Sequence, residues 1–162
     1  MKHVISVLVE NEFGVLSRIA SLFSGRGFNI ESLTVAETAD KSVSSMTIVT
    51  SGENYIIEQI TKQLNKLINV IKVVELTESV QMAREMILLK FAVNSGAKRL
   101  ELLRLIEVYQ GRVLELGARS LIVELTGERA KIEAALEVLT PFAIKDISRT
   151  GMVALARDSV KS

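Results

Sequence analysis

The sequence predicts an α+β protein in which the element order β-α-β-β-α-β occurs twice along 162 residues. β-branched apolar runs alternate with stretches at helical spacing, and the second half repeats the order of the first without repeating its residues. This order is that of the ferredoxin-like fold, an antiparallel sheet with both helices on one face. We therefore expect two such domains, at residues 1–78 and 79–162, packed closely because no proline-rich or serine-rich linker separates them.

The first half contains four predicted strands and two predicted helices. The strands are the apolar or alternating runs at residues 4–9, 30–38, 43–50 and 70–76. The first helix begins near Val15 and stops at Gly25-Arg26-Gly27, and the second follows Ser51-Gly52-Glu53-Asn54. Their predicted apolar stripes are Leu16, Ile19, Ala20 and Phe23 in the first helix, and Ile57, Ile60, Leu64 and Leu67 in the second.

The second half repeats this order. Its strands are predicted at residues 86–93, 112–116, 121–125 and within 144–155, where the last one bends near Gly151. Its helices are predicted at residues 97–110 and 128–139, ended by Gly111 and Pro141 respectively. The stripe of the first of these helices is Leu100, Leu103 and Ile106.

A sheet with both helices on one side leaves its other face uncovered. In the first half this face would carry small and hydroxylated side chains, and its edge strands would need pairing or protection. A homodimer that joins sheets or stacks their faces would answer both needs. The alternative is a sheet face that is simply solvated.

Composition excludes several classes of function. Twenty basic and nineteen acidic side chains give a net charge of +1, which offers no broad electrostatic surface for nucleic acid or an anionic membrane. Cysteine is absent, so disulfides and thiolate chemistry are excluded, and a reducing compartment fits. The chain enters a strand pattern without a leader, and its apolar runs are far shorter than the roughly 18 residues of a membrane span. We expect a soluble, cytoplasmic protein.

The residues that most catalytic or metal sites require are missing. The only histidine is His3, and with no cysteine this excludes zinc-ligand sets and Ser-His or Cys-His nucleophile pairs. Glu10 and Glu12 flank a turn and are interpreted as solvated charges. Gly25-Arg26-Gly27 follows a helix instead of a strand, so it is interpreted as a helix cap and not as part of a dinucleotide fingerprint. We expect no catalytic residue, no metal and no cofactor in this chain.

RNA-recognition modules share the order β-α-β-β-α-β, so this class is the remote alternative. Such modules stack bases on aromatic side chains of their central strands. The corresponding runs here read V-I-S-V-L and S-M-T-I-V, without an aromatic residue. The sequence therefore argues against nucleic-acid binding.

The run E-N-E-F-G-V-L-S-R-I-A-S-L-F-S-G-R-G-F-N, from Glu10 to Asn29, offers the features that bind a free amino acid. A helix that begins after a glycine turn presents unpaired N–H groups to a carboxylate. Asparagine oxygens can accept hydrogen bonds from an ammonium group, and Gly14 permits close approach. The candidate residues are Asn11, Gly14, Val15, Leu16, Asn29 and Ile30. The alternative is that the asparagines and Gly14 only make a turn and end a helix.

The longer run H-V-I-S-V-L-V-E-N-E-F-G-V-L-S-R-I-A-S-L-F-S-G-R-G-F-N-I-E-S-L-T-V resembles the start of the ACT domain in the small, regulatory subunit of acetolactate synthase, also called acetohydroxyacid synthase. The turn before the helix is general to amino-acid-sensing ACT domains, whereas G-R-G-F-N-I-E-S-L is far more specific to this family. The resemblance covers the whole chain, including a second ferredoxin-like domain.

This resemblance implies a non-catalytic regulatory subunit in branched-chain amino acid biosynthesis. Its large catalytic subunit would condense pyruvate with a second 2-ketoacid, using thiamine diphosphate, magnesium and FAD. The small subunit would raise that activity and confer feedback inhibition by valine, while its C-terminal domain contacts the large subunit. A stand-alone ACT sensor, acting on another enzyme or on transcription, is the alternative.

The family's effector sites lie between ACT domains of two chains. Carried over by motif, one chain supplies Asn11, Gly14, Val15 and Leu16, and its mate supplies Asn29 and Ile30. One methylene changes the binding free energy by only about 1–3 kcal/mol, so a site for branched aliphatic amino acids is better supported than one for valine alone.

Overall fold

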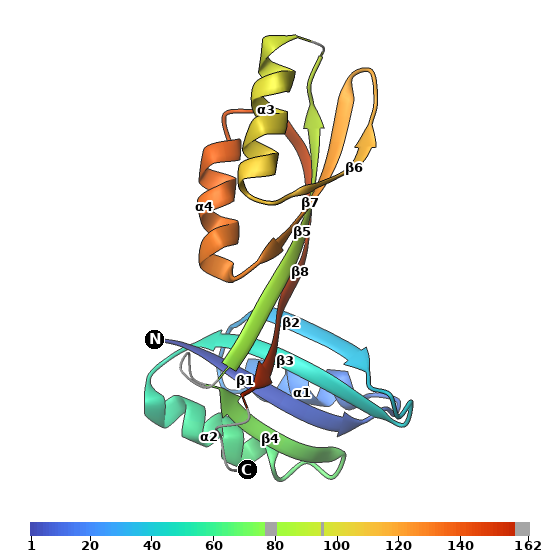
Figure 1. The fold of residues 1–162 in the computed structure, drawn as a ribbon. Coiled ribbons are helices and arrows are strands. Elements are labelled where there is room, and N and C mark those ends of the chain that lie inside the picture. Colours follow the sequence, from blue (N-terminus) through green and yellow to red (C-terminus); the bar gives the residue numbers. More distant parts are fainter. Residues whose placement is uncertain (77–80, 95, 158–162) are drawn as a thin grey trace. The chain divides into compact units, whose positions relative to one another are not determined.

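The computed structural model describes residues 1–76, 81–94 and 96–157, and the chain forms two compact units (Figure 1). The first unit holds Met1–Met82 together with the end of the chain from Met152, and the second holds Ala83–Gly151. The predicted boundary at residues 78 and 79 lies outside the described residues. By its contacts, the end of the last strand belongs with the first unit, which differs from the predicted domain of residues 79–162.

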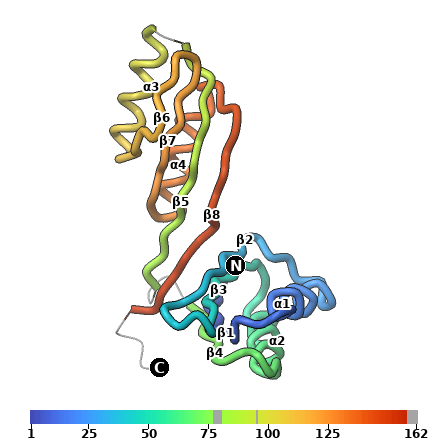
Figure 2. The backbone as a smooth tube through the Cα atoms, turned by 90° about the vertical axis from the view of Figure 1, so that its right-hand side faces the viewer, coloured from blue at the N-terminus to red at the C-terminus, as the bar shows by residue number. Residues whose placement is uncertain are grey.

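The first unit is an antiparallel four-stranded sheet with the strand order β2-β3-β1-β4. Both of its helices lie on one face of this sheet (Figure 2). Its elements are β1 (Lys2–Glu10), α1 (Val15–Ser24), β2 (Ile30–Glu37), β3 (Val43–Ser51), α2 (Asn54–Leu64) and β4 (Val70–Leu76). The two central strands are therefore β1 and β3, and the edges are β2 and β4.

The second unit repeats this topology with the strand order β6-β7-β5-β8. Its elements are β5 (Gln81–Ala92), α3 (Ala97–Val108), β6 (Arg112–Leu116), β7 (Ser120–Gly127), α4 (Arg129–Leu139) and β8 (Ile144–Ala156). Strand β5 begins in the first unit, and strand β8 ends in it. The prediction of two ferredoxin-like β-α-β-β-α-β folds is confirmed.

Each unit has its own aliphatic core between sheet and helices. The first core is made by Ile5, Val7, Val9, Val15, Ile19, Phe23, Met46, Ile48, Ile57, Ile60 and Leu64. The second is made by Ile87, Leu89, Phe91, Val93, Leu102, Ile106, Leu121, Val123, Leu125, Ile132, Ala135 and Leu139. Both sets alternate along strands and recur every three or four residues along helices, as burial of one face requires.

In two helices, the buried apolar positions differ by one or two residues from the predicted ones. In α1 the buried stripe begins at Val15, and Leu16 is 41% exposed. In α3 the buried residues are Leu102 and Ile106, whereas Leu100 is 60% exposed. Both helices carry apolar residues at neighbouring positions, so periodicity alone could not choose the face that packs on the sheet.

Gly111 was predicted to end α3, but the left-handed residue there is Gln110, with φ of 57°. The Gly111 N–H donates to the Ile106 carbonyl at 2.7 Å. A Cβ at Gly111 would lie 2.5 Å from Leu125 Cδ2 and 2.8 Å from Ile106 Cγ2. This glycine is therefore required by close packing against the core.

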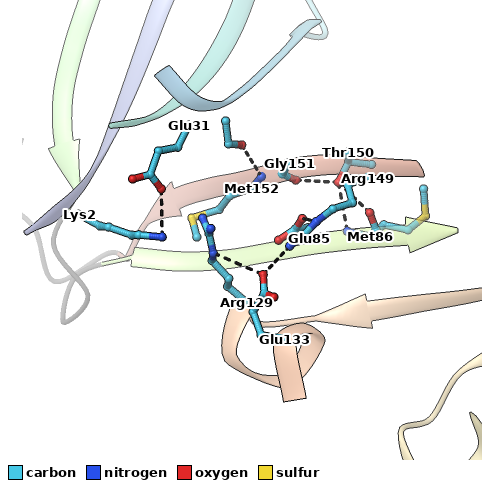
Figure 3. A network of polar contacts seen from close by, with 11 residues as sticks. Lys2, Glu31, Glu85, Met86, Arg129, Glu133, Arg149, Thr150, Gly151 and Met152 are labelled. Carbon is cyan, nitrogen blue, oxygen red and sulfur yellow. Dashed lines mark hydrogen bonds and ion pairs between the residues drawn. The ribbon is translucent and has the colours of Figure 1, made fainter. Parts of the chain in front are cut away.

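An ion pair between the buried Glu85 and the more exposed Arg149 ties β5 to β8 in the second unit (Figure 3). Glu85 is 4% exposed, and its Oε1 accepts from Arg149 Nε at 2.6 Å. Arg149 Nη2 also donates to Glu133 Oε1 of α4 at 2.8 Å. The hydrogen bond to Glu85 raises the pKa of the Arg149 guanidinium above its usual range, so the guanidinium keeps its positive charge.

The substitution Gly111→Ala tests the packing role of this glycine. We expect it to lower the free energy of unfolding of the second unit by about 1–3 kcal/mol, because the added methyl overpacks the core. Gln110→Gly is the matched control, since it relieves the left-handed strain next door and should leave stability equal or higher. Urea unfolding of the full chain measures both, and native stability in Gly111→Ala would refute the packing argument.

Candidate functional site

The turn between β1 and α1 leaves the start of α1 without an internal cap. Gly14 is the N-cap residue, with φ of 81° and ψ of −2°, and no side chain caps the helix. The Val15 N–H reaches the Glu12 carbonyl at 3.4 Å, whereas the N–H groups of Leu16 and Ser17 find no acceptor among the described residues. The positive end of the α1 dipole is thus open to an anion.

The conformation of Gly14 and the space beside it both favour close approach of a ligand. Its positive φ is strained for any residue with a Cβ. A Cβ built at Gly14 would meet nothing within 4 Å, so the volume next to the turn is free in a single copy of the chain. A side chain placed there would fill that volume.

Asn11 is held against the loop between β2 and β3. Its backbone N–H donates to the Ser42 carbonyl at 2.7 Å, and its Nδ2 donates to the Lys41 carbonyl at 2.9 Å and to Glu37 Oε1 at 3.2 Å. Both amide hydrogens are therefore used by the chain itself. The remaining polar atom, Oδ1, is the acceptor that an ammonium group requires.

The other predicted site residues divide between surface and core. Leu16 and Asn29 are exposed, and Ile30 is half-buried against the first core. The Asn29 carbonyl accepts a hydrogen bond from Thr50 Oγ1 at 2.7 Å. The Val15 side chain is only 4% exposed and packs inside, so this residue can reach a ligand only through its backbone.

The two predicted sets of site residues lie at opposite ends of the sheet within one chain. Ile30, at the start of β2, pairs with Thr50, which in turn pairs with His3 at the start of β1. The turn after β1 lies beside the other end of β2, at Glu37. The eight residues of β2 span roughly 25 Å, so one copy cannot bring Asn29 to its own Asn11.

A buried asparagine, missed by the sequence analysis, supports the turn from the side of β4. Asn69 is 7% exposed, and its Nδ2 donates to Glu10 Oε2 at 2.8 Å and to Glu12 Oε2 at 3.3 Å. Its Oδ1 accepts from Arg18 Nη1 of α1. The two glutamates are therefore part of a local network and not merely solvated charges. A single asparagine before a valine-rich strand gave no signal for this role.

No competing chemical site is evident in the described ranges. No group of three or more His, Asp or Glu side chains there could hold a metal ion. His3 pairs through Nδ1 with Glu75 Oε1 at 2.9 Å. None of the described helices is long and apolar enough to cross a membrane.

The second unit has a hollow of about 800 Å³ beside the first turn of α3 and the loop after α4. The polar side chains that line it are Asn94, Lys98 and Glu101, and all three are exposed. The rest of its wall is largely apolar. Solvated groups at an open rim do not specify a ligand.

Comparison with known proteins identifies the family. Residues 5–72 match the AHAS small subunit-like ACT domain, and residues 84–158 match the small subunit of acetolactate synthase. The putative acetolactate synthase small subunit of Mycobacterium tuberculosis (strain H37Rv) is 50% identical over 155 residues, which cover 96% of this chain and 92% of that one. The chain belongs to the family of acetolactate synthase small subunits.

Other relatives agree. The acetolactate synthase small subunit of Aquifex aeolicus is 45% identical over 157 residues, covering 97% of this chain and 82% of that one. The crystal structure of the Thermotoga maritima acetolactate synthase small subunit superposes with a TM-score of 0.90 at 36% identity, covering 99% of both chains. The small-subunit match thus extends across both units and includes the end of β8.

In this small subunit, Asn69 provides a stability test of the turn that precedes α1. We expect Asn69→Ala to lower the free energy of unfolding by about 1–3 kcal/mol, because it removes the buried partner of Glu10 and Arg18. Asn65→Ala is the matched control, since Asn65 is exposed and its Nδ2 contacts only the Thr61 carbonyl of α2. Equal urea midpoints of unfolding for the two variants would contradict the role of Asn69 in holding the turn before α1.

Proposed function

We propose that this chain is the regulatory subunit of a cytoplasmic acetolactate synthase in branched-chain amino acid biosynthesis. It associates with the large catalytic subunit, raises its activity and confers feedback inhibition by valine bound between two copies of the ACT domain. The observation that carries the proposal is the uncapped start of α1, at a glycine turn with free volume beside it, in a member of this family.

The chemistry of this turn suits a free amino acid. The N–H groups of Leu16 and Ser17, with the positive end of the α1 dipole, would donate hydrogen bonds to the ligand carboxylate without a buried cation. Asn11 Oδ1 would accept a hydrogen bond from the ammonium group. The exposed Leu16 side chain then offers apolar surface to a branched aliphatic side chain.

Pairing of two β2 strands would complete the site. The outer edge of β2 has no partner within the described part of one copy. An antiparallel pair of β2 strands from two copies would set Ile30 of one opposite Glu37 of the other. Because Asn11 contacts Glu37, the turn of one copy would then lie beside Asn29 and Ile30 of its mate. Twofold symmetry would give two equal sites.

Inhibition follows if valine binds one arrangement of the assembly more tightly than another. A site built from two chains has this property, because its occupancy stabilises one placement of the two copies. In this proposal thiamine diphosphate, magnesium and FAD belong to the large subunit. No step of the condensation is placed on this chain, and its C-terminal domain makes the contact with the large subunit.

Reconstitution with an acetolactate synthase large subunit tests the function directly. We expect the chain to raise the activity and valine to reduce it, and we expect Gly14→Asp to abolish the inhibition while keeping the activation. The added carboxylate would fill the free volume beside the turn and repel the ligand carboxylate.

Gly96→Asp is the matched control for this experiment. Gly96 is also a helix N-cap glycine with positive φ and free space around its Cβ position, but it precedes α3 in the second unit. We expect this variant to remain sensitive to valine. A chain that copurifies with no large subunit but binds valine would instead be a stand-alone sensor, and unchanged inhibition in Gly14→Asp would refute the site.

Mixing two defective variants tests whether the site is shared between chains. Gly14→Asp and Asn29→Ala should each weaken valine binding by about tenfold or more, because each removes one half of the site. Co-refolding them in equal amounts should restore native affinity at about a quarter of the sites, since half of the dimers then carry one intact site. Titration calorimetry on the small subunit measures this fraction, and no recovery would indicate a site within one chain.

A further inference from the structure

The end of β8 crosses the sheet face of the first unit that lies opposite the helices. We name residues Met152–Ala156 the C-terminal strap. The Met152 N–H donates to Ser32 Oγ of β2 at 3.2 Å (Figure 3), and the Ala154 N–H donates to Thr47 Oγ1 of β3 at 3.4 Å. Two N–H groups on the same side of the strap therefore donate hydrogen bonds to hydroxyl groups of the neighbouring strands β2 and β3.

The strap end of this face is shielded from solvent. Thr47 and Val49 of β3 alternate with the core residues Met46 and Ile48, so they point away from the helices, yet they are only 5% and 1% exposed. Ala154 in the strap is itself 7% exposed. Further along the same face Ser45 is only half-buried. The chain's own C-terminal segment thus occupies part of a face that the sequence left for solvent or a second copy.

The strap touches β2 just after the residues proposed to bind the effector. Ser32 follows Ile30 by two positions, and the pairing of β2 with β3 shifts register between them. The Asn29 carbonyl is fixed to β3 by Thr50 Oγ1. Ligand binding at Asn29 and Ile30 would therefore act on the part of β2 where the register shifts. The hydroxyl group of Ser32, which holds the strap, follows directly after this shift.

On the other side, β8 is anchored within the second unit immediately before the strap. Arg149 binds Glu85 and Glu133, and the Met86 N–H donates to Thr150 Oγ1 at 3.1 Å. Only Gly151, with φ of 77°, lies between this anchor and Met152. Two residues, Thr150 and Gly151, therefore separate Arg149 from the strap along the chain.

We propose that the C-terminal strap is the route by which occupancy of the effector site reaches the second unit, an inference that rests on the proposed function. Valine bound at the start of β2 alters the two hydrogen bonds that the strap donates to Ser32 and Thr47. The covalent continuity of β8 then carries this change to Arg149 and, through Glu133, to α4. The hydroxyl groups of Ser32 and Thr47 are positioning groups for the signal and do not contact the effector.

The double variant Ser32→Ala, Thr47→Val tests this route. It removes both hydroxyl acceptors while keeping the size of the side chains nearly unchanged. In the complex reconstituted with the large subunit, we expect activity without valine to remain native. The maximal inhibition that saturating valine produces should fall by at least about fivefold, in line with a typical allosteric coupling. Calorimetry should show that valine binding to the small subunit stays within a factor of about three.

Ser45→Ala is the matched control, because Ser45 lies on the same face of β3 and its hydroxyl group makes no hydrogen bond within the described residues. It should behave as the native chain. Native inhibition in the double variant would overturn the proposal. Joint loss of binding and inhibition would also overturn it, since the hydroxyl groups would then belong to the effector site.

Hydrogen exchange supplies a readout that does not depend on catalysis. Valine should change deuterium uptake in the peptide covering residues 144–157 of the native small subunit, and this change should disappear in the double variant while the change around residues 11–17 persists. An unaltered response at residues 144–157 in the double variant would refute the route. Failure of the proposed function looks different, because the native chain itself would then neither bind valine nor respond to it.

Discussion

Two backbone hydrogen bonds at the end of β1 fix the position of the turn that precedes α1. The Glu10 N–H donates to the Asn69 carbonyl at 2.8 Å, and the Asn11 N–H donates to the Ser42 carbonyl at 2.7 Å. They fix the chain to the loops on both sides before it enters the turn. Gly14 then redirects the backbone, so α1 begins with its free N–H groups at the surface and its apolar stripe in the core. The free N–H groups on which the proposed site depends and the core packing of α1 thus follow from the same few residues.

Strand pairing imposes the next constraint. The turn and the start of β2 are separated by the full length of β2, so any ligand that needs both must recruit a second chain. In the proposed site, this separation would make ligand binding depend on how two copies are placed, which a pocket within one domain would not. The edge strand that would pair with the second copy is also the strand that carries half of the proposed site.

Sequence periodicity was sufficient for the order of the elements, for most of their borders to within two residues, and for the two helix ends marked by glycine and proline. These features depend on local chemistry, such as the glycine at φ of 70° after α1. The choice between Val15 and Leu16 as a core residue depended on tertiary packing, and so did the buried role of Asn69. The strap was missed for the same reason, since Ser32 and Thr47 lie more than a hundred positions from Met152 and Ala154.

The hydroxylated sheet face gains a physical explanation from the strap. The strap crosses the face of the sheet and does not pair edge to edge with β2 or β3. Its N–H groups therefore cannot bond to their backbone carbonyls and need side-chain acceptors. Small side chains let the strap approach, and serine and threonine hydroxyl groups satisfy its N–H groups. Such bonds contribute only about 0.5–1.5 kcal/mol each, because the same groups form hydrogen bonds with water in the unfolded chain. A contact of this strength can hold the strap in place and still yield when β2 shifts, which a continuous ladder of backbone hydrogen bonds would resist.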